Sequence, residues 1–275
     1  MASDFAADPG ERLATEWDRD VPSEDTLVRA YVDAFADMIE TQARAAGGRV
    51  LGDDAMLLAD AGSPGAYLNG GVLRAPLHEQ AADDVVARMT EFFAGAPGGP
   101  WMLFSAMPTP DLRPHGLQPV GHPPLMFRPA GGERRPPPDD LEIVEATDPD
   151  TLRVLERTLF DGYPMPELRD LGAGAFLPDA LLADDRFRFY LGLVAGEPVG
   201  TSMAHLGQSM SHVEWVSATS SVRGRGYGEA MTWAATLVLP DRPSMLISSD
   251  DGRRTYERMG YLPLTRFTLW IGSRD

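Results

Sequence analysis

The residues best suited to chemistry lie between 212 and 239, where a predicted strand runs through a glycine-rich turn into a predicted helix. Val213 and Trp215 favour a strand, and the turn at 223–228 reads Arg-Gly-Arg-Gly-Tyr-Gly. Apolar residues at 230, 233, 234 and 237 then follow with helical spacing. Amides and the dipole at a helix N-terminus attract anions, glycines let phosphate approach the backbone, and arginines add charge. This segment therefore predicts a site for a phosphate-bearing ligand.

The spacing of the turn narrows the choice of ligand. A nucleotide P-loop needs a lysine, and all 24 basic residues of this chain are arginine. The dinucleotide fingerprint also fails, because Glu229 stands where the third glycine belongs. The turn instead fits R-x-x-G-x-G, with Arg223, Gly226 and Gly228, directly after a strand. That pattern resembles the pyrophosphate loop of the GNAT-type N-acetyltransferases, which bind acetyl-CoA there; a plain strand-to-helix turn is the alternative.

A second motif follows at the distance this family shows. Residues 244–247 read as a short buried strand, and Ser249 or Asp250 can cap a short helix after it. The run Tyr-Glu-Arg-Met-Gly-Tyr at 256–261 is similar to the family's Y-E-x-x-G-F segment, with Gly260 in the place of a helix C-cap. The two motifs in order extend the resemblance over about residues 140–275.

The resemblance implies roles for individual residues. Tyr256 would protonate the leaving thiolate, and Glu214 would serve as the base directly or through water. The alternatives are a packing role for Tyr256, a rim or salt-bridged carboxylate for Glu214, and His205 or His212 as the base. The expected acetyl-CoA contacts are the backbone of Val216, Ser217 and Ala218 and the loop Arg223, Gly224, Arg225, Gly226, Tyr227 and Gly228. Phe160, Tyr163 and Met165 are candidates for an acceptor pocket, with ordinary loop packing as the alternative.

Composition sets the wider bounds. The chain has 275 residues, enough for two domains, and 43% of them are hydrophobic. The absence of cysteine excludes disulfides and thiolate metal sites, and no metal is implied. A net charge of −17 argues against nucleic acid and anionic membranes and is compatible with a cationic small-molecule amine. With no apolar run of 18 residues and an acidic N-terminus, we expect a cytoplasmic protein without a membrane span, either monomer or homodimer.

The first half repeats the order of elements predicted for the second half. Gly116 aligns with Gly260 at an ungapped shift of 144, which also places 101–105 on 245–249. At this shift residues 79–84 stand opposite the loop 223–228 and carry three acids and no glycine, while Leu112 stands opposite Tyr256. We interpret the first half as a degenerate copy without cofactor or chemistry. His78, His115 and His122 are expected at the surface.

Predicted elements complete the outline. In the first half we expect helices at 23–46, capped by Ser23, and at 80–95, with strands at 55–59, 66–73, 101–105 and 120–128. In the second half we expect strands at 141–146, 187–194, 198–206 and 264–271, and a helix starting near 151 and capped by Asp148 or Asp150. The charged, proline-rich residues 131–140 form a linker between domains at 1–130 and 141–275.

Together these features predict an α/β (α+β type) protein of two tandem GNAT-like domains, each a mixed, mostly antiparallel sheet flanked by helices. The function implied by the resemblance is transfer of an acetyl group from acetyl-CoA to an amine in a ternary complex. The alternatives are a non-catalytic acyl-CoA-binding or sensing protein, and a transferase for a longer acyl donor or a hydroxyl acceptor. A nucleotide-binding enzyme of another fold is disfavoured by the missing lysine and the glycine spacing.

Overall fold

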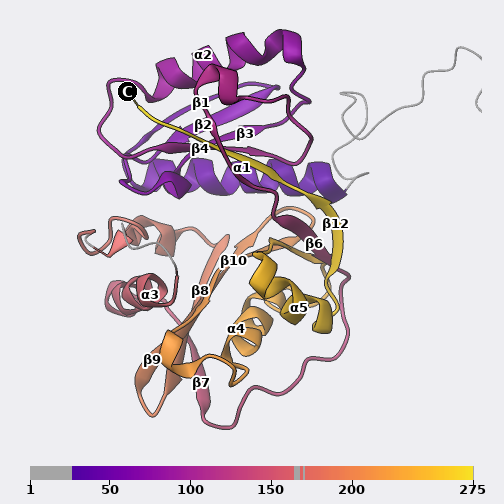
Figure 1. The fold of residues 1–275 in the computed structure, drawn as a ribbon. Helices are drawn as coiled ribbons and strands as arrows, with labels where there is room; N and C mark the ends of the chain where they lie inside the picture. The colour runs from indigo at the N-terminus through magenta and orange to yellow at the C-terminus, as the bar shows by residue number, and fades with distance from the viewer. Residues whose placement is uncertain (1–26, 164–167, 170, 275) are drawn as a thin grey trace, which may run out of the picture.

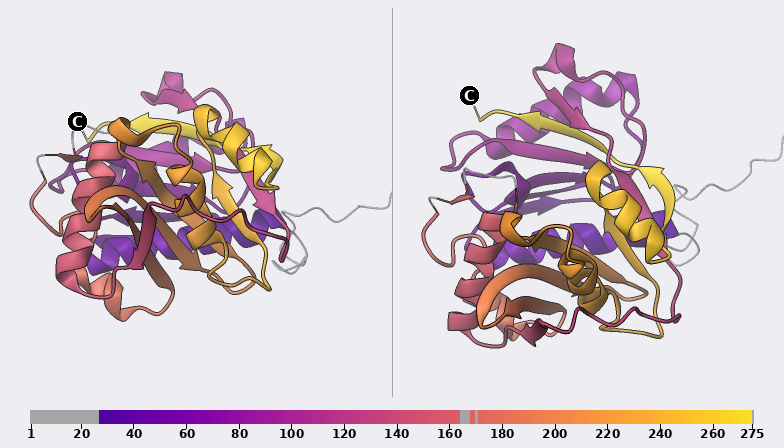
Figure 2. Two further views of the ribbon diagram at one scale, coloured as in Figure 1. Left: turned by 90° about the horizontal axis from the view of Figure 1, so that it is seen from below. Right: turned by 60° about the horizontal axis from the view of Figure 1, so that its bottom comes forward.

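The computed structural model describes residues 27–163, 168–169 and 171–274. Two β-sheets of six and seven strands lie on either side of a long helix, α1 (Leu27–Ala45), as Figures 1 and 2 show. α1 buries a stripe that includes Tyr31, Phe35 and Met38, at the spacing expected for one helix face. The cap predicted at Ser23 lies outside the described residues.

The first sheet has the strand order β1-β2-β3-β4-β13-β5. Its pairs are antiparallel except for β3 and β4, which run parallel. Helix α2 (Ala82–Phe93) covers the face opposite α1 (Figure 1). Its strands are β1 (Arg49–Gly52), β2 (Met56–Asp60), β3 (Asn69–Leu73), β4 (Trp101–Ser105), β5 (Gln118–Gly121) and β13 (Thr268–Gly272).

The second sheet has the order β12-β6-β11-β10-β9-β8-β7, with β10 and β11 parallel. Helices α3 (Pro149–Gly162) and α4 (Tyr227–Thr236) belong to separate apolar clusters and cover this sheet, and α5 (Asp250–Arg258) follows β11. Its strands are β6 (Pro124–Arg128), β7 (Leu141–Glu145), β8 (Phe187–Val194), β9 (Glu197–Leu206), β10 (Ser211–Ala218), β11 (Ser244–Ile247) and β12 (Leu262–Arg266). Short 3-10 helices lie at η2 (Ala66–Leu68), η3 (Glu79–Ala81), η4 (Arg113–His115), η6 (Asp179–Ala183) and η7 (Ser220–Val222).

The two sheets exchange one strand each. β6 comes from the first half but lies between β11 and β12, whereas β13 comes from the end of the second half and lies between β4 and β5. The single strands predicted at 120–128 and 264–271 are therefore wrong. Each of these runs forms two strands, which lie in different sheets. The two segments cross where the amide of Phe267 donates to the carbonyl of Pro123. Gly121, Pro123 and Pro124 mark the first break in the sequence, but they do not reveal that the two strands pair in different sheets.

The predicted fold class is confirmed: each sheet is mixed, mostly antiparallel and flanked by helices. A shift of 144 residues places β3 on β10, α2 on α4 and β6 on β13, so the two halves repeat one strand order. The core does not divide at the linker, because one apolar cluster joins Phe104 of β4 to Trp215 of β10 across α1. The division at 131–140 stays a prediction, although neither sheet is confined to one of the predicted ranges.

The helix ends follow the local signals. Asp148 caps α3 by accepting a hydrogen bond of 2.9 Å from the amide of Thr151. Ser249 caps α5 through the amide of Gly252 at 3.1 Å, and Gly260 ends that segment with a φ of +89°. The predicted strand at 66–73 begins as the 3-10 turn η2 and becomes β3 only at Asn69.

Candidate active site

A β-bulge in β10 organises the site. Glu214 pairs with Met203 and Ser217 with Thr201, so two residues, Trp215 and Val216, stand opposite one residue of β9. Trp215 has a φ of +52°, a conformation unusual for a residue with a side chain. The hydroxyl of Thr201 supports the bulge by donating to the carbonyl of Trp215 at 2.8 Å. On the two sides of the bulge, Glu214 and Val216 line two different hollows.

Beyond the first two residues of β10 the sheet opens. β10 and β11 pair only at Ser211 and His212, so the strands separate just before Glu214. On its other side β10 stays paired with β9 as far as Ala218. The edge of β10 from Val216 to Ala218 lines a groove instead of pairing with β11. This unpaired edge consists of the three residues whose backbone the family resemblance implies as acetyl-CoA contacts.

The glycine-rich loop lies at the end of this groove. Gly224 and Gly226 have φ values of +80° and +85°, so each needs the left-handed conformation that glycine adopts at no steric cost. Gly226 is the N-cap of α4, and Gly228 lies in its first turn. A Cβ added at Gly228 would meet no atom within 4 Å. The loop is therefore shaped to expose backbone amides to an anion at a helix N-terminus.

Most of the residues predicted to bind the cofactor meet in one groove of about 470 Å³. Arg225 is the exception, since it belongs to the loop but does not line the groove. The groove is also lined by Thr232 of α4 and by Gly252, Thr255 and Arg258 of α5. The predicted residues that do line it are Val216, Ser217, Ala218, Arg223, Gly224, Gly226, Tyr227, Gly228 and Tyr256.

The charges around the loop favour an anion. Arg223 and Arg225 are exposed on its surface. Glu229, in the first turn of α4, is the acid closest to the loop in sequence, and it faces Arg258 at 3.8 Å and Arg135 at 4.0 Å. Because two arginines offset this carboxylate, it leaves the loop less negative than the sequence alone suggests. Arg135 belongs to the linker, which the sequence analysis did not connect with the site.

Tyr256 of α5 lies on the same side of the bulge as the loop. Its ring is partly buried, 5.9 Å from that of Tyr261, and it lines the groove beside Gly252 and Thr255. Burial raises the pKa of Tyr256 well above its usual value of about 10, and the nearby Tyr261 and Glu214 raise it further. Its phenol therefore carries a proton at neutral pH, as a general acid requires.

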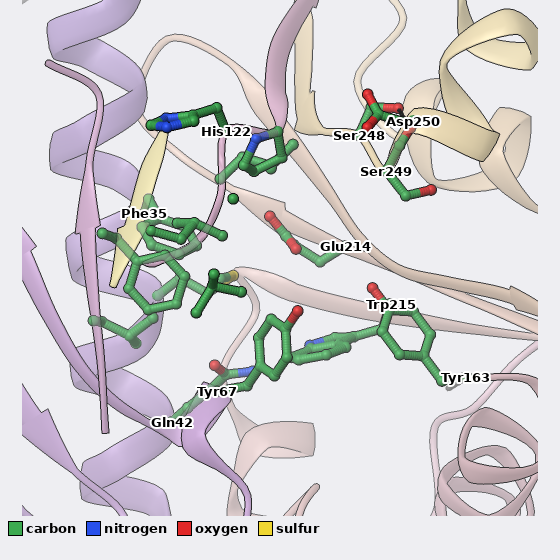
Figure 3. A pocket seen from close by; sticks show the side chains of 18 residues that line it. Phe35, Gln42, Tyr67, His122, Tyr163, Glu214, Trp215, Ser248, Ser249 and Asp250 are labelled. Carbon is green, nitrogen blue, oxygen red and sulfur yellow. Dashed lines mark hydrogen bonds between the residues drawn. The ribbon is translucent and has the colours of Figure 1, made fainter. Parts of the chain in front are cut away.

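A second cavity of about 300 Å³ opens on the other side of the bulge. Glu214 and Trp215 line it, and the groove begins with the next residue, Val216. Its remaining walls come from both halves of the chain, including Phe35 of α1 and Tyr67 of η2. Figure 3 shows the Glu214 carboxylate in the open space between Phe35 on one side and Tyr67 and Tyr163 on the other. The two hollows thus flank one strand at its bulge.

Burial changes the acidity of Glu214. It raises the pKa of this carboxyl to about 8, and the hydroxyl of Tyr31, which donates to Oε1 at 3.4 Å, opposes the shift. Tyr31 is itself fully buried against the rings of His212 and Phe267. A carboxyl that ionises near pH 8 is matched to accepting a proton from an amine.

Solved structures resemble the chain over most of its length. A GCN5-related N-acetyltransferase from Kribbella flavida is 19% identical, with a TM-score of 0.68 over 90% of this chain and 95% of that chain. A protein described as a GNAT-family acetyltransferase from Novosphingobium aromaticivorans is 14% identical, with a TM-score of 0.56 over 93% and 100%. A GCN5-related N-acetyltransferase from Sphaerobacter thermophilus is 17% identical, with a TM-score of 0.51 over 90% and 94%. The chain has the GNAT fold. No family model and no curated protein matches the sequence.

On this GNAT fold the other predicted candidates fall in different places. Tyr163 lines the cavity, whereas Phe160 packs against Phe176 and does not; Met165 lies outside the described residues. His205 and His212 are fully buried and line neither hollow, so neither is positioned as a base. Burial also lowers the pKa of His212 well below its usual value.

Sequence reasoning missed the first-half wall of the cavity. The interpretation of the first half as a degenerate copy gave it no part in the site, but four of its residues line this space: Phe35, Gln42, Tyr67 and Phe104. His122, expected at the surface, is exposed and also forms part of the wall. One signal was present: Gln42 is a polar residue on the apolar stripe of a helix.

Two further findings bear on partners. Within the described ranges, no helix combines the length and apolarity needed to cross a bilayer. Those same residues contain no group of three His, Cys, Asp or Glu side chains that could hold a metal ion.

Proposed function

We propose that the protein transfers the acetyl group of acetyl-CoA to the amine of a small molecule, with both substrates bound together. The observation that carries the proposal is the meeting of two hollows at the bulge of β10. One hollow holds the glycine loop and Tyr256, and the other holds Glu214. Such an arrangement brings a phosphate-bearing donor and an amine to the same point from opposite sides.

The groove suits the donor. The exposed amides around Gly226 and Gly228, with Arg223 beside them, would hold the pyrophosphate, and the unpaired edge from Val216 to Ala218 would hold the pantetheine arm. When bound, acetyl-CoA supplies the acetyl group as a thioester, which is already activated for attack. The loop does not need a metal ion for this contact, since backbone donors and arginine provide the positive potential.

Two side chains would move the protons. Glu214 accepts a proton from the incoming ammonium group, directly or through water, which leaves a neutral nitrogen with a free electron pair. A C–N bond then forms at the acetyl carbon as the C–S bond breaks. Tyr256 donates its phenolic proton to the departing sulfur. The acylated nitrogen then loses its second proton, directly or through water, to the tyrosinate, which restores the phenol, and the proton on Glu214 passes to solvent. The acetyl group passes directly between substrates, so no enzyme nucleophile is required.

The test is product formation. Purified protein, acetyl-CoA and a panel of amines should release CoA and yield an acetylated amine detectable by mass spectrometry. Tyr256→Phe should lower kcat about a hundredfold while leaving the affinity for acetyl-CoA unchanged. Tyr190→Phe on β8, which removes a half-buried hydroxyl outside both hollows, is the matched control. Tight acetyl-CoA binding without turnover of any amine would instead favour an acyl-CoA-binding or sensing protein.

A further inference from the structure

The cavity around Glu214 has a wall that is mainly aromatic and aliphatic. Five aromatic side chains line it, and three of them form a connected group: the rings of Tyr67 and Tyr163 each stand edge-on to Trp215 at 5.9 Å. Aromatic faces attract both apolar bodies and ammonium groups. At about 300 Å³ the cavity is at the small end of the range of about 300–1,000 Å³ for ligand sites. The five aromatic residues are Phe35, Tyr67, Phe104, Tyr163 and Trp215.

The charged groups of the cavity are acids. Glu214 lies inside it and Asp250 at its exposed rim, while no arginine of the described residues lines it. Arg266 approaches Asp250 to 4.0 Å from outside the wall, and the imidazole of His122 is exposed. A carboxylate on the acceptor would therefore enter a space of like charge without a cation to pair with. An ammonium group would meet complementary charge.

Gln42 gives the cavity a neutral polar end. Its side chain is only 2% exposed, yet neither its amide nitrogen nor its amide oxygen has a hydrogen-bond partner in the described part of the chain. Buried amides are nearly always paired, so this one can pair with a bound ligand. Gln42 lies two helical turns beyond Phe35 on the same stripe of α1, about 10 Å along the axis. The indole nitrogen of Trp215 is also buried, with no partner among the described residues.

We infer that the acceptor is a small primary amine with an aromatic-sized apolar body, a neutral hydrogen-bonding group remote from the amine, and no carboxylate. The amine lies at Glu214, the body packs on the aromatic wall, and the neutral group pairs with Gln42. This inference rests on the proposed function, and it names the substrate class that the same site accepts.

A matched set of amines tests it. Tyramine carries all three features, phenethylamine lacks the hydroxyl, tyrosine adds a carboxylate, and spermidine has charge without an aromatic body. With saturating acetyl-CoA at pH 8.5, kcat/KM for tyramine should exceed that for tyrosine by about a hundredfold or more. It should exceed that for phenethylamine by about three- to tenfold. Equal rates with tyrosine, or a preference for spermidine, would overturn the inference.

Gln42→Leu supplies the internal control. Leucine keeps the volume and removes two unpaired buried polar atoms, so the fold should be retained, as an unchanged or higher Tm would show. The variant should raise KM for tyramine to that for phenethylamine, whereas Tyr190→Phe should leave both KM values unchanged. A parallel loss with both amines would contradict the role of Gln42.

Failure of the proposed function can be told apart from failure of this inference. If acetyl-CoA binds but no amine releases CoA, the transferase proposal fails. Calorimetric titration of amines into the CoA-saturated protein then still decides the inference, because binding needs no turnover. Tyramine should bind at least tenfold more tightly than tyrosine; equal affinity would overturn it.

Discussion

The two halves of the chain share one strand order but differ in the turn that follows β10 in the second half and β3 in the first half. In the second half, β10 leads through a loop with glycines at 224, 226 and 228 into α4. In the first half, β3 leads through η3 into α2, and residues 79–84 place the exposed acids Glu79, Asp83 and Asp84 at the corresponding positions. One turn would attract a pyrophosphate, and the other would repel it.

The strands differ as well. β10 is bulged between Glu214 and Ser217, whereas β3 pairs with β2 in unbroken register. Opposite Glu214 and Trp215 the first half has Gly70 and Gly71, and a Cβ added at Gly71 would lie 2.5 Å from Met89. In the first half a methionine side chain thus occupies the space that a side chain at residue 71 would need. Leu112, opposite Tyr256, is fully buried in the first-half core.

The comparison teaches that strand order and site are separable in a duplicated fold. The first half keeps the framework, and its α1 and η2 provide a wall of the second-half cavity. That the first half binds no cofactor stays a prediction, and substitutions in either half can test it.

We expect the largest loss of acetyl-CoA affinity from a substitution that makes the loop at 223–228 resemble residues 79–84. Gly228→Asp introduces the residue found at position 84, and it should weaken acetyl-CoA binding about a thousandfold through like-charge repulsion and occupation of the groove. The backbone of Gly228 needs no left-handed conformation and a Cβ there is unobstructed, so the fold should survive. Calorimetry measures the affinity, and Asp84→Gly should leave it unchanged. Unaltered binding in Gly228→Asp would place the donor elsewhere.

The second effect concerns the acid that the first half lacks. Since Glu214 acts when ionised and its pKa is about 8, kcat/KM should rise with pH and level off above about pH 8. Glu214→Gln should lower the plateau about a hundredfold and remove this dependence. The titratable groups near the carboxyl are Tyr31 of α1, Tyr163 after α3 and Tyr256 of α5. Burial keeps their phenols protonated through this range.

Stability provides the control for Glu214→Gln. The pKa of this carboxyl is higher in the folded state than its usual value, so its contribution to folding is complete at acidic pH and is lost as pH rises through about 8. The variant should therefore have a Tm equal to or above the wild type at pH 9. A lower Tm would mean that loss of activity reflects damage to the fold.

We expect a smaller effect on activity from Tyr31, a first-half residue that contacts Glu214. Tyr31→Phe removes the hydroxyl that stabilises the Glu214 carboxylate but keeps the ring stacked on His212 at 4.4 Å. The pKa of Glu214 should rise, so the rate at pH 7 should fall a few-fold while the plateau at high pH is retained. Tyr190→Phe should shift nothing. A pH profile unchanged by Tyr31→Phe would show that α1 does not tune the base.

The sequence predicted the parts of the site that depend on local signals. The loop at 223–228, the α5 cap at Ser249 and the turn at Gly260 each follow from residue types at fixed spacing, and the structure shows all three. The contacts expected of Val216, Ser217 and Ala218 came from the family resemblance instead. The position of Glu214 beside a cavity followed from neither, because it depends on a bulge that residue alternation does not encode.

Features formed by distant segments were missed. The exchange of β6 and β13 depends on how two similar sheets pack, and either apolar run could satisfy either sheet. The acceptor cavity needs α1 and η2 from one half against β10 from the other. The role of Gln42 could not be predicted from the sequence, because a single polar residue on an apolar stripe has meaning only once its neighbours are known.

The most direct test of the account is the stoichiometry of acetyl-CoA binding to the intact chain, measured by calorimetric titration. We expect one site per chain, abolished by Gly228→Asp and unaffected by Asp84→Gly. Two sites, or one site that survives Gly228→Asp, would contradict the assignment of the cofactor to the second half and the interpretation of the first half as a copy that has lost it.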